Sequence, residues 1–175
     1  GFVVDNYLSG KEARRFDTFI HYGLAAGIDA LKDSGLALER EDLTQIGVCI
    51  GSGIGGLPLI EATHTAYTAG GPRKISPFFV PGTIINLISG QLSIMFGLKG
   101  PNFAVVSACT TANHCIGEAG RLIEYGDAQN EGLIACLKYF IWAQRFVAAA
   151  GFLGLGAPFP VALEEVGEEG GRCIE

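Results

Sequence analysis

Cys109 stands where a run of small and β-branched residues meets a helix-like pattern, in the stretch VVSACTTANHCIGEAGRLIEYGD (residues 105–127). The thiolate is the reactive form of cysteine. A helix N-terminus lowers a thiol pKa because its unpaired N–H groups and its dipole favour negative charge. Two hypotheses follow: Cys109 is a nucleophile at a helix start, or it is a small apolar side chain that fills a core. In the first, its own N–H group would lie near a developing oxyanion.

The three histidines of the chain are the candidates for a general base or a metal ligand. His114 follows Cys109 by five positions, which is more than one helical turn, so it is predicted to lie off the Cys109 face. We interpret it as a hydrogen-bonded helix residue and not as the base. His21 and His64 have no partners at metal-ligand spacing, and no metal site is predicted.

The stretch GSGIGG, residues 51–56, satisfies G-x-G-x-x-G directly after a predicted strand. The dinucleotide fingerprint also needs an acidic residue about 20 positions further on. No Asp or Glu occurs between Glu61 and Glu118, so we predict no nucleotide cofactor. Two alternatives remain: a tight turn between strand and helix, or a loop that lets a ligand tail approach the backbone, with Ile54 projecting toward it.

Two basic clusters stand out on a chain whose net charge is −6. Lys11, Arg14 and Arg15 have the i, i+3, i+4 spacing of one helix face, and Arg73-Lys74 forms the second cluster. Each is either an ordinary solvated surface or a docking site for an acidic partner. The net negative charge argues against general nucleic-acid binding.

The elements that must position these residues alternate between helix and strand. The predicted helices cover 9–34 (from the capping box Ser9–Glu12 to Ser34-Gly35), 57–69, about 14 residues after Gly82, and 110–125; the predicted strands cover 46–50 and 103–107. This alternation favours an α/β fold.

Bulk composition agrees with a globular protein, because 49% of the 175 residues are hydrophobic and only 17% are charged. The five cysteines are odd in number and include no CxxC pair, which predicts reduced thiols and a cytoplasmic location. We predict no signal peptide and no membrane span, since no apolar run reaches about 18 residues.

Residues 7–127 resemble the N-terminal half of the β-ketoacyl-acyl-carrier-protein synthases, most closely the bacterial synthase II type. The stretches that carry the resemblance are KEARRFDTFIHYGLAAG, IGVCIGSGIGGL, GGPRKISPFFVPGTIINLISGQLSIMFGLKGPN, VVSACTTANHCIG and IEYGDA. The resemblance implies the thiolase fold, in which two α/β halves form αβαβα layers, and a homodimer. Residues 1–127 would be the N-terminal half only, and 128–175 a divergent, apparently shortened continuation of the same domain.

The resemblance also implies a function. Cys109 would take an acyl chain from acyl carrier protein as a thioester, and malonyl-carrier protein would then lose CO2 and attack it. Ile54 would lie at the acyl pocket, and residues 78–96 would form pocket and dimer-interface structure. No cofactor or metal is implied. The residues expected to meet the acidic carrier protein are Lys11, Arg14, Arg15, Arg73 and Lys74.

The sequence departs from the family pattern in two respects. Ala112 and Asn113 replace residues that are usually different, with glycine usual at position 112. The family's HGTST-like and GH motifs, which hold its catalytic histidines, do not occur, so we expect the chain alone to be impaired in condensation. Three alternatives stay open: an inactive fragment that binds acyl carrier protein or a synthase subunit, a polyketide ketosynthase, or an ordinary enzyme whose recorded sequence is incomplete after Asp127.

Overall fold

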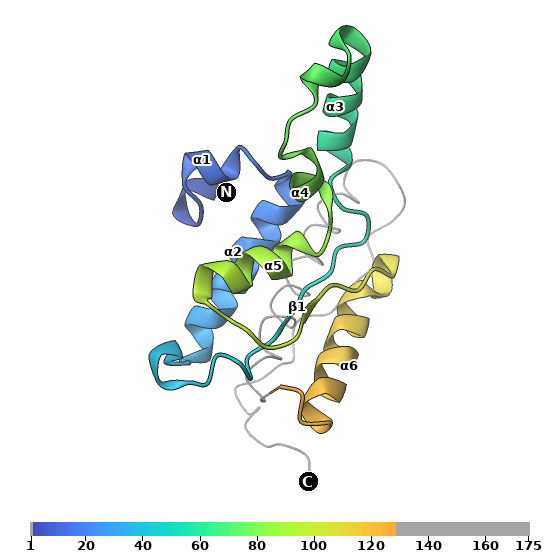
Figure 1. The fold of residues 1–175 in the computed structure, drawn as a ribbon. Helices are drawn as coiled ribbons and strands as arrows, with labels where there is room; N and C mark the ends of the chain where they lie inside the picture. The colour runs from blue at the N-terminus through green and yellow to red at the C-terminus, as the bar shows by residue number, and fades with distance from the viewer. Residues whose placement is uncertain (1, 129–175) are drawn as a thin grey trace. The chain divides into compact units, whose positions relative to one another are not determined.

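The structure is a computed structural model that describes residues 2–128, all of which belong to one compact unit, residues 1–142. The predicted continuation at 128–175 lies outside the described residues except for Ala128. Among the described residues, helices precede and follow each of two short parallel strands (Figure 1). The α/β class predicted from the sequence is therefore confirmed.

The N-terminal region contains two helices where one was predicted. A short 3₁₀ turn (Val4–Asn6) precedes α1 (Gly10–Ala13), which begins at the predicted Ser9–Glu12 capping box. The chain then leaves the helix, and α2 (Thr18–Ser34) starts anew at Asp17. The Asp17 carboxylate accepts hydrogen bonds from the N–H groups of Phe19 (3.3 Å) and of Leu59 (2.8 Å). The prediction of one continuous helix was wrong because Asp17 caps the second helix and also contacts a distant segment.

The two strands are β1 (Val48–Cys49) and β2 (Asn102–Phe103), shorter than the predicted 46–50 and 103–107. They pair in parallel, with Val48 opposite Asn102 and Cys49 opposite Phe103. The predicted buried character of the first segment is confirmed, since residues 46, 48, 49 and 50 are each at most 3% exposed.

The other elements follow the predicted order with one correction. After the 3₁₀ turn Leu38–Arg40 and β1 come α3 (Leu57–Gly70) and the 3₁₀ turn Pro72–Lys74. The single helix predicted after Gly82 is instead two: α4 (Phe79–Thr83), which contains Pro81 and Gly82, and α5 (Leu87–Phe96). Proline is tolerated in the first turn of a helix, so Pro81 did not prevent α4. Another 3₁₀ turn (Ala108–Thr110) leads into α6 (Thr111–Glu124).

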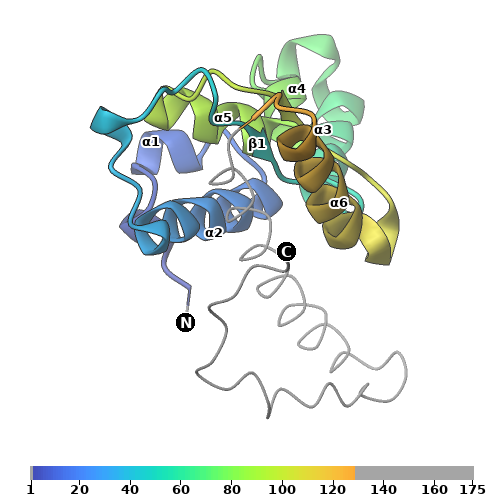
Figure 2. The same ribbon diagram turned by 90° about the horizontal axis from the view of Figure 1, so that it is seen from below.

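The helices cover both sides of the strand pair. Helix α5 contacts α2 and both strands, whereas α6 contacts β1 (Figure 2). The main core lies on the α2–α5 side, where Ile20, Leu24, Ile88 and Leu92 are fully buried. A second, smaller cluster lies under α6 and contains Cys49, Cys115 and Ala119.

Ser89 on α5 is fully buried and joins this helix to both strand segments. Its hydroxyl accepts from the Ile50 N–H (3.0 Å) and lies 2.9 Å from the Phe103 carbonyl oxygen, to which it can donate. A buried polar side chain is stable here because backbone groups satisfy it. Within residues 2–128, the structure contains no helix that is both long enough and apolar enough to cross a membrane.

Candidate active site

Two loops meet at one edge of the strand pair. Because β1 and β2 are parallel, their carboxyl ends point to the same edge, where ligands of α/β proteins commonly bind. There β1 continues into the glycine loop, residues 51–56, and β2 continues through residues 104–107 to Cys109. A Cβ atom at Gly53 would lie 3.6 Å from the Ala108 carbonyl oxygen, so the glycine loop packs against the turn that holds the cysteine.

Gly51 allows this close approach. A Cβ atom at this position would overlap the Val105 carbonyl oxygen, and it would lie 2.5 Å from Cγ2 of Thr111 and 3.1 Å from Sγ of Cys115. A backbone oxygen cannot move aside cheaply, so only glycine fits. Gly51 is thus explained by close packing against other parts of the chain itself, whereas the approach of a ligand tail to the glycine loop stays a prediction.

Cys109 is exposed and lies in the 3₁₀ turn Ala108–Thr110, directly before the first residue of α6. Side-chain hydrogen bonds close this turn: the Ser107 N–H donates to Oγ1 of Thr111 (2.9 Å), and this hydroxyl donates to the Ala108 carbonyl (2.8 Å). Thr111 itself is buried. Cys109 therefore lies at the N-terminal end of α6, where the positive end of the helix dipole lies.

Ala108 is the one non-glycine residue between positions 2 and 128 with a positive φ, at 49°. This left-handed conformation costs about 1–3 kcal/mol for a residue with a side chain and persists only where neighbouring contacts impose it. Here the neighbours are the Thr111 hydrogen bond and the packed Gly53. The conformation turns the chain from the extended segment into the helix, with Cys109 at the corner.

The other described cysteines, Cys49 and Cys115, belong to the core. Both are at most 3% exposed. The hydrogen bond with Cys49 and burial raise the pKa of the Cys115 thiol far above its ordinary value. The Cys115 thiol therefore stays protonated at neutral pH. In the described part of the chain, none of the three cysteines Cys49, Cys109 and Cys115 forms a disulfide.

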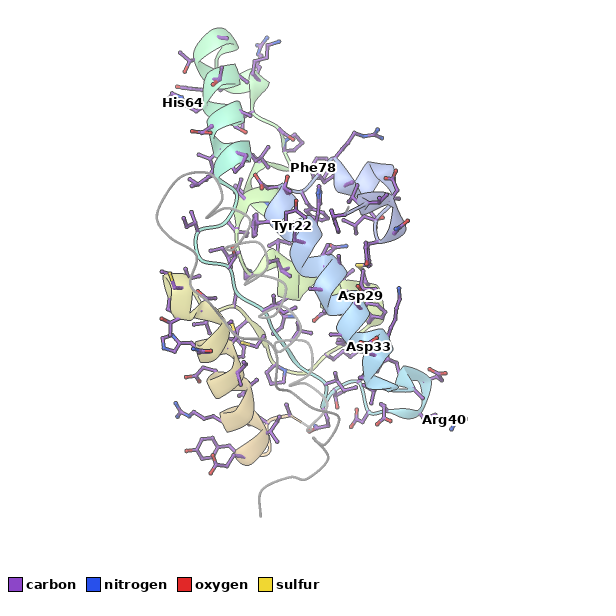
Figure 3. The ribbon with its side chains drawn as sticks, turned by 180° about the vertical axis from the view of Figure 1, so that it is seen from behind. Tyr22, Asp29, Asp33, Arg40, His64 and Phe78 are labelled. Carbon is purple, nitrogen blue, oxygen red and sulfur yellow. The ribbon has the colours of Figure 1, made fainter. Side chains whose placement is uncertain are left out.

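The histidines lie in three different surroundings. His114 is hydrogen-bonded on the helix, as predicted: its Nδ1 lies 2.6 Å from Oγ of Ser107. His21 contacts the Ala13 carbonyl through Nε2 (2.8 Å) and ties α1 to α2. His64 is exposed on α3, away from α6 (Figure 3). Among residues 2–128, no three His, Cys, Asp or Glu side chains group together as a possible metal site.

Ile54 lies in the glycine loop and is 70% exposed. The loop is held at Gly56, whose N–H donates to the Thr83 carbonyl (3.2 Å). A shallow apolar hollow is lined by Cys49, Phe103, Ala119 and Leu122, between the strands and α6, and Ile54 does not line it. The role predicted for Ile54 in an acyl pocket therefore stays a prediction.

The basic residues do not share one helix face as the spacing predicted. Helix α1 ends at Ala13, so Arg14 is its C-cap and Arg15 lies beyond it. The Arg15 guanidinium stacks 4.6 Å from the centre of the Phe78 ring, a cation–π contact with the segment before α4 (Phe78 is labelled in Figure 3). The side chains that remain exposed are those of Lys11, Arg14, Arg73 and Lys74.

Sequence reasoning missed Ser107 and Thr111, which hold the turn, and Asp17, which caps two helices. A weak signal existed for each: Ser and Thr next to a helix start often bond to nearby backbone, and Asp17 precedes an apolar helical pattern. The left-handed Ala108 carried no signal, because alanine favours ordinary helical conformations.

Together, the parallel strand pair with helices on both sides, and a cysteine at a helix N-terminus beside a glycine loop, define a thiolase-like α/β protein. Residues 2–130 match the family model "Beta-ketoacyl synthase, N-terminal domain". The chain belongs to the β-ketoacyl synthase family, as the resemblance of its motifs implied.

Relatives support this assignment. The chain is 61% identical over 128 residues to 3-oxoacyl-[acyl-carrier-protein] synthase 2 of Vibrio cholerae. The matched region covers 73% of this chain and 31% of that protein. It is 53% identical over 156 residues to the synthase 2 of Vibrio harveyi, covering 89% and 36%. The chain thus spans about a third of the length of these relatives.

Solved structures agree on the fold. One is the complex AntDE:AntF, a type II PKS acyl-carrier protein with its ketosynthase bound to the hexaketide; it has a TM-score of 0.69 at 27% identity, covering 73% of this chain and 37% of the matched chain. A β-ketoacyl synthase from Burkholderia phymatum has a TM-score of 0.60 at 26% identity, covering 73% and 32%. The predicted thiolase-like fold, of which residues 2–128 are an N-terminal part, is therefore confirmed.

Proposed function

We propose that this chain carries the acyl-accepting part of a 3-oxoacyl-acyl-carrier-protein synthase of fatty-acid elongation. The observation that carries the proposal is the exposed Cys109 at the N-terminus of α6, in a chain that belongs to the β-ketoacyl synthase family. The fatty-acid role is favoured over a polyketide role because the synthase 2 relatives are 45–61% identical, against 27% for the polyketide ketosynthase.

The first step is thioester exchange. The Cys109 thiolate attacks the carbonyl carbon of acyl-carrier protein, the bond from that carbon to the carrier sulfur breaks, and the carrier leaves as a thiol with the proton that Cys109 lost. Negative charge develops on the carbonyl oxygen in the tetrahedral intermediate. The N–H groups at the start of α6 are suited to stabilise that charge.

The second step is decarboxylative condensation. Malonyl-carrier protein loses CO2, its carbanion attacks the acyl carbon on Cys109, the bond from that carbon to Sγ breaks, and the cysteine leaves as a thiolate. In the family, histidines of HGTST-like and GH motifs serve this step, and neither motif occurs in the sequence. We therefore expect the 175-residue chain by itself to form the acyl-enzyme and to condense slowly, if at all.

The proposed partner is acyl carrier protein, an acidic protein, and the docking residues are those of the two basic clusters. Lys11 lies within α1 and Arg14 is its C-cap, and Arg73 and Lys74 lie in the 3₁₀ turn after α3; all four are exposed. Arg15 contributes through its stacked position on Phe78. We further propose that Ile54 contacts the acyl chain, that the protein forms a homodimer, and that it works in the cytoplasm.

The test of acylation is incubation of the purified chain with acyl-carrier protein labelled in the acyl group. We expect label that survives denaturation on the wild type and none on Cys109→Ala. Absence of label on the wild type would refute the acyl-accepting role. Robust formation of a longer β-ketoacyl product would refute the expectation that condensation is impaired.

The test of docking compares two charge reversals on exposed arginines. Arg14→Glu should weaken carrier-protein binding several-fold, with a smaller salt dependence, because rim charges steer association. Arg40→Glu is the matched control, since Arg40 lies at the other end of α2 (Figure 3). Equal effects of the two reversals would mean that net charge alone, and not the α1 region, governs binding.

The exposed basic residues also favour a second candidate, a non-catalytic module that binds carrier protein or a synthase subunit. Iodoacetamide separates the two. An activated Cys109 should be alkylated faster near pH 7 than a free cysteine in a peptide, whereas a non-catalytic module should show the ordinary rate.

A further inference from the structure

Ser107 and His114 lie on the two sides of Cys109 in the chain, and the chemistry proposed above uses neither. Ser107 is the residue before the 3₁₀ turn, and His114 lies in the first full turn of α6. Their side chains meet, with 2.6 Å between Oγ of Ser107 and Nδ1 of His114. The contact therefore spans the whole turn that presents the thiol.

The same serine anchors the turn through its backbone. Its N–H group donates to Oγ1 of Thr111, which in turn donates to the Ala108 carbonyl. Ser107 is thus held from two directions: His114 bonds its side chain and Thr111 bonds its main chain. Thr111 is buried and His114 is exposed, so the two bonds fix the serine to the inner and the outer side of α6.

This double attachment acts on a strained residue. Ala108 follows Ser107 and holds the left-handed φ of 49° that orients Cys109. A strained conformation persists only when its surroundings over-determine it. Removing one of the bonds at Ser107 gives the turn freedom to relax toward ordinary φ values, which would move the thiol away from the N-terminus of α6.

The bond to His114 forms for either neutral tautomer of the imidazole. A serine hydroxyl can donate to an unprotonated Nδ1, or it can accept from a protonated one. Nδ1 is occupied by the serine, which agrees with the prediction that His114 is not the base for Cys109. What the imidazole supplies is a fixed hydrogen-bonding atom at the position of Nδ1.

We propose that Ser107 and His114 are positioning residues that lock the Cys109 turn in its strained form and so keep the thiol at the helix N-terminus. This inference rests on the proposed role of Cys109 as the acyl-accepting residue. Neither residue contacts the reacting atoms in this account. Their effect passes through the backbone of Ser107 and Ala108 to the position of the thiol.

The experiment measures the rate of Cys109 alkylation by iodoacetamide near neutral pH in the full chain. A net hydrogen-bond contribution corresponds to a factor of about 2 to 10, so His114→Ala should slow alkylation by about fivefold. His114→Asn should restore most of the rate, because the asparagine amide places a polar atom close to the position of Nδ1. His64→Ala is the matched control on exposed α3 and should alkylate at the wild-type rate.

A double-mutant cycle tests whether the two residues act together. Ser107→Ala should slow alkylation about as much as His114→Ala, and the double variant should be no slower than either, because both remove the same bond. Thermal unfolding of each variant shows whether it is folded at the assay temperature. If Ser107 and His114 had only a structural role, their removal would lower the melting temperature, and His114→Asn would not restore the alkylation rate.

Three results would overturn the inference. His114→Ala could be alkylated at the wild-type rate, the double variant could lose the product of the two single losses in rate, or His114→Asn could fail to recover the rate. Alkylation needs no acyl donor, so these comparisons stay readable even if the chain forms no thioester, the result that would refute the proposed function. Equal alkylation rates in the variants and the wild type would contradict this inference, whereas a missing thioester would contradict the proposed function. The two outcomes are therefore distinguishable.

Discussion

Gly51→Ala tests the close contact between the glycine loop and the cysteine turn. The new methyl group would overlap the Val105 carbonyl oxygen and would lie 2.5 Å from Cγ2 of Thr111. A methyl group forced into a packed site costs about 1–3 kcal/mol, and we expect the upper end, about 3 kcal/mol, because one obstacle is backbone. For a chain of this length, about 3 °C of melting temperature are lost per kcal/mol, which gives a decrease of about 9 °C.

The assay is thermal unfolding of wild-type and variant chains, followed by circular dichroism. Gly117→Ala is the matched control, because Gly117 is exposed on α6 and nothing lies within 4 Å of its Cβ position. Alanine favours the helix there, so this variant should gain about 0.5–1 kcal/mol. A Gly51→Ala chain that melts with the wild type would refute the close contact of Gly51 with Val105 and Thr111.

Three further predictions follow from buried or capped groups. Ser89→Ala leaves backbone groups of the two strand segments without their partner and should lower the free energy of unfolding by about 2–3 kcal/mol in urea titrations; a loss below about 0.5 kcal/mol would contradict its bridging role. Cys49 and Cys115 should resist iodoacetamide until the chain unfolds, because burial and their hydrogen bond raise the pKa of the Cys115 thiol; peptide mapping that finds either labelled before Cys109 would be inconsistent with this core. Hydrogen bonds from the side chain and the backbone N–H of Ser9 lower the pKa of Glu12 below its ordinary 4.5. The stabilising effect of the ionised Glu12 is therefore present above that value and is lost as pH falls through the lowered pKa. The difference in melting temperature between wild type and Glu12→Gln should therefore shrink as the pH falls through the lowered pKa, and a difference that did not change with pH would argue against the capping box.

The sequence predicted the helix ends that depend on local chemistry. The capping box at Ser9–Glu12 and the stops at Gly35 and Gly126 are confirmed; both glycines have left-handed φ values, 70° and 79°. These signals act within a few residues, so no tertiary information is needed to interpret them. The α/β class was predictable for a similar reason, because it depends on the alternation of periodic segments.

The failures arise where distant segments decide the local structure. Helix α2 starts at Asp17 partly because its carboxylate also binds the Leu59 N–H, a contact across 42 positions. The paired strands are shorter than their apolar runs, because pairing depends on a neighbour that periodicity cannot show. At the candidate site, the place of Cys109 directly before a helix was predicted. The Ser107–Thr111–Ala108 bonds that hold it were not found, since they depend on an unusual backbone angle.

The parallel pairing of β1 with β2 has a consequence for how the site comes into being. Val48 and Asn102 pair although more than fifty positions separate them in the chain. Contacts between residues so distant in sequence form late in folding, because the intervening segment must first be ordered. During synthesis, the cysteine turn can therefore assemble only after α3, α4 and α5 have emerged, and until then Cys109 would lie in a segment that has not yet taken its place beside the glycine loop.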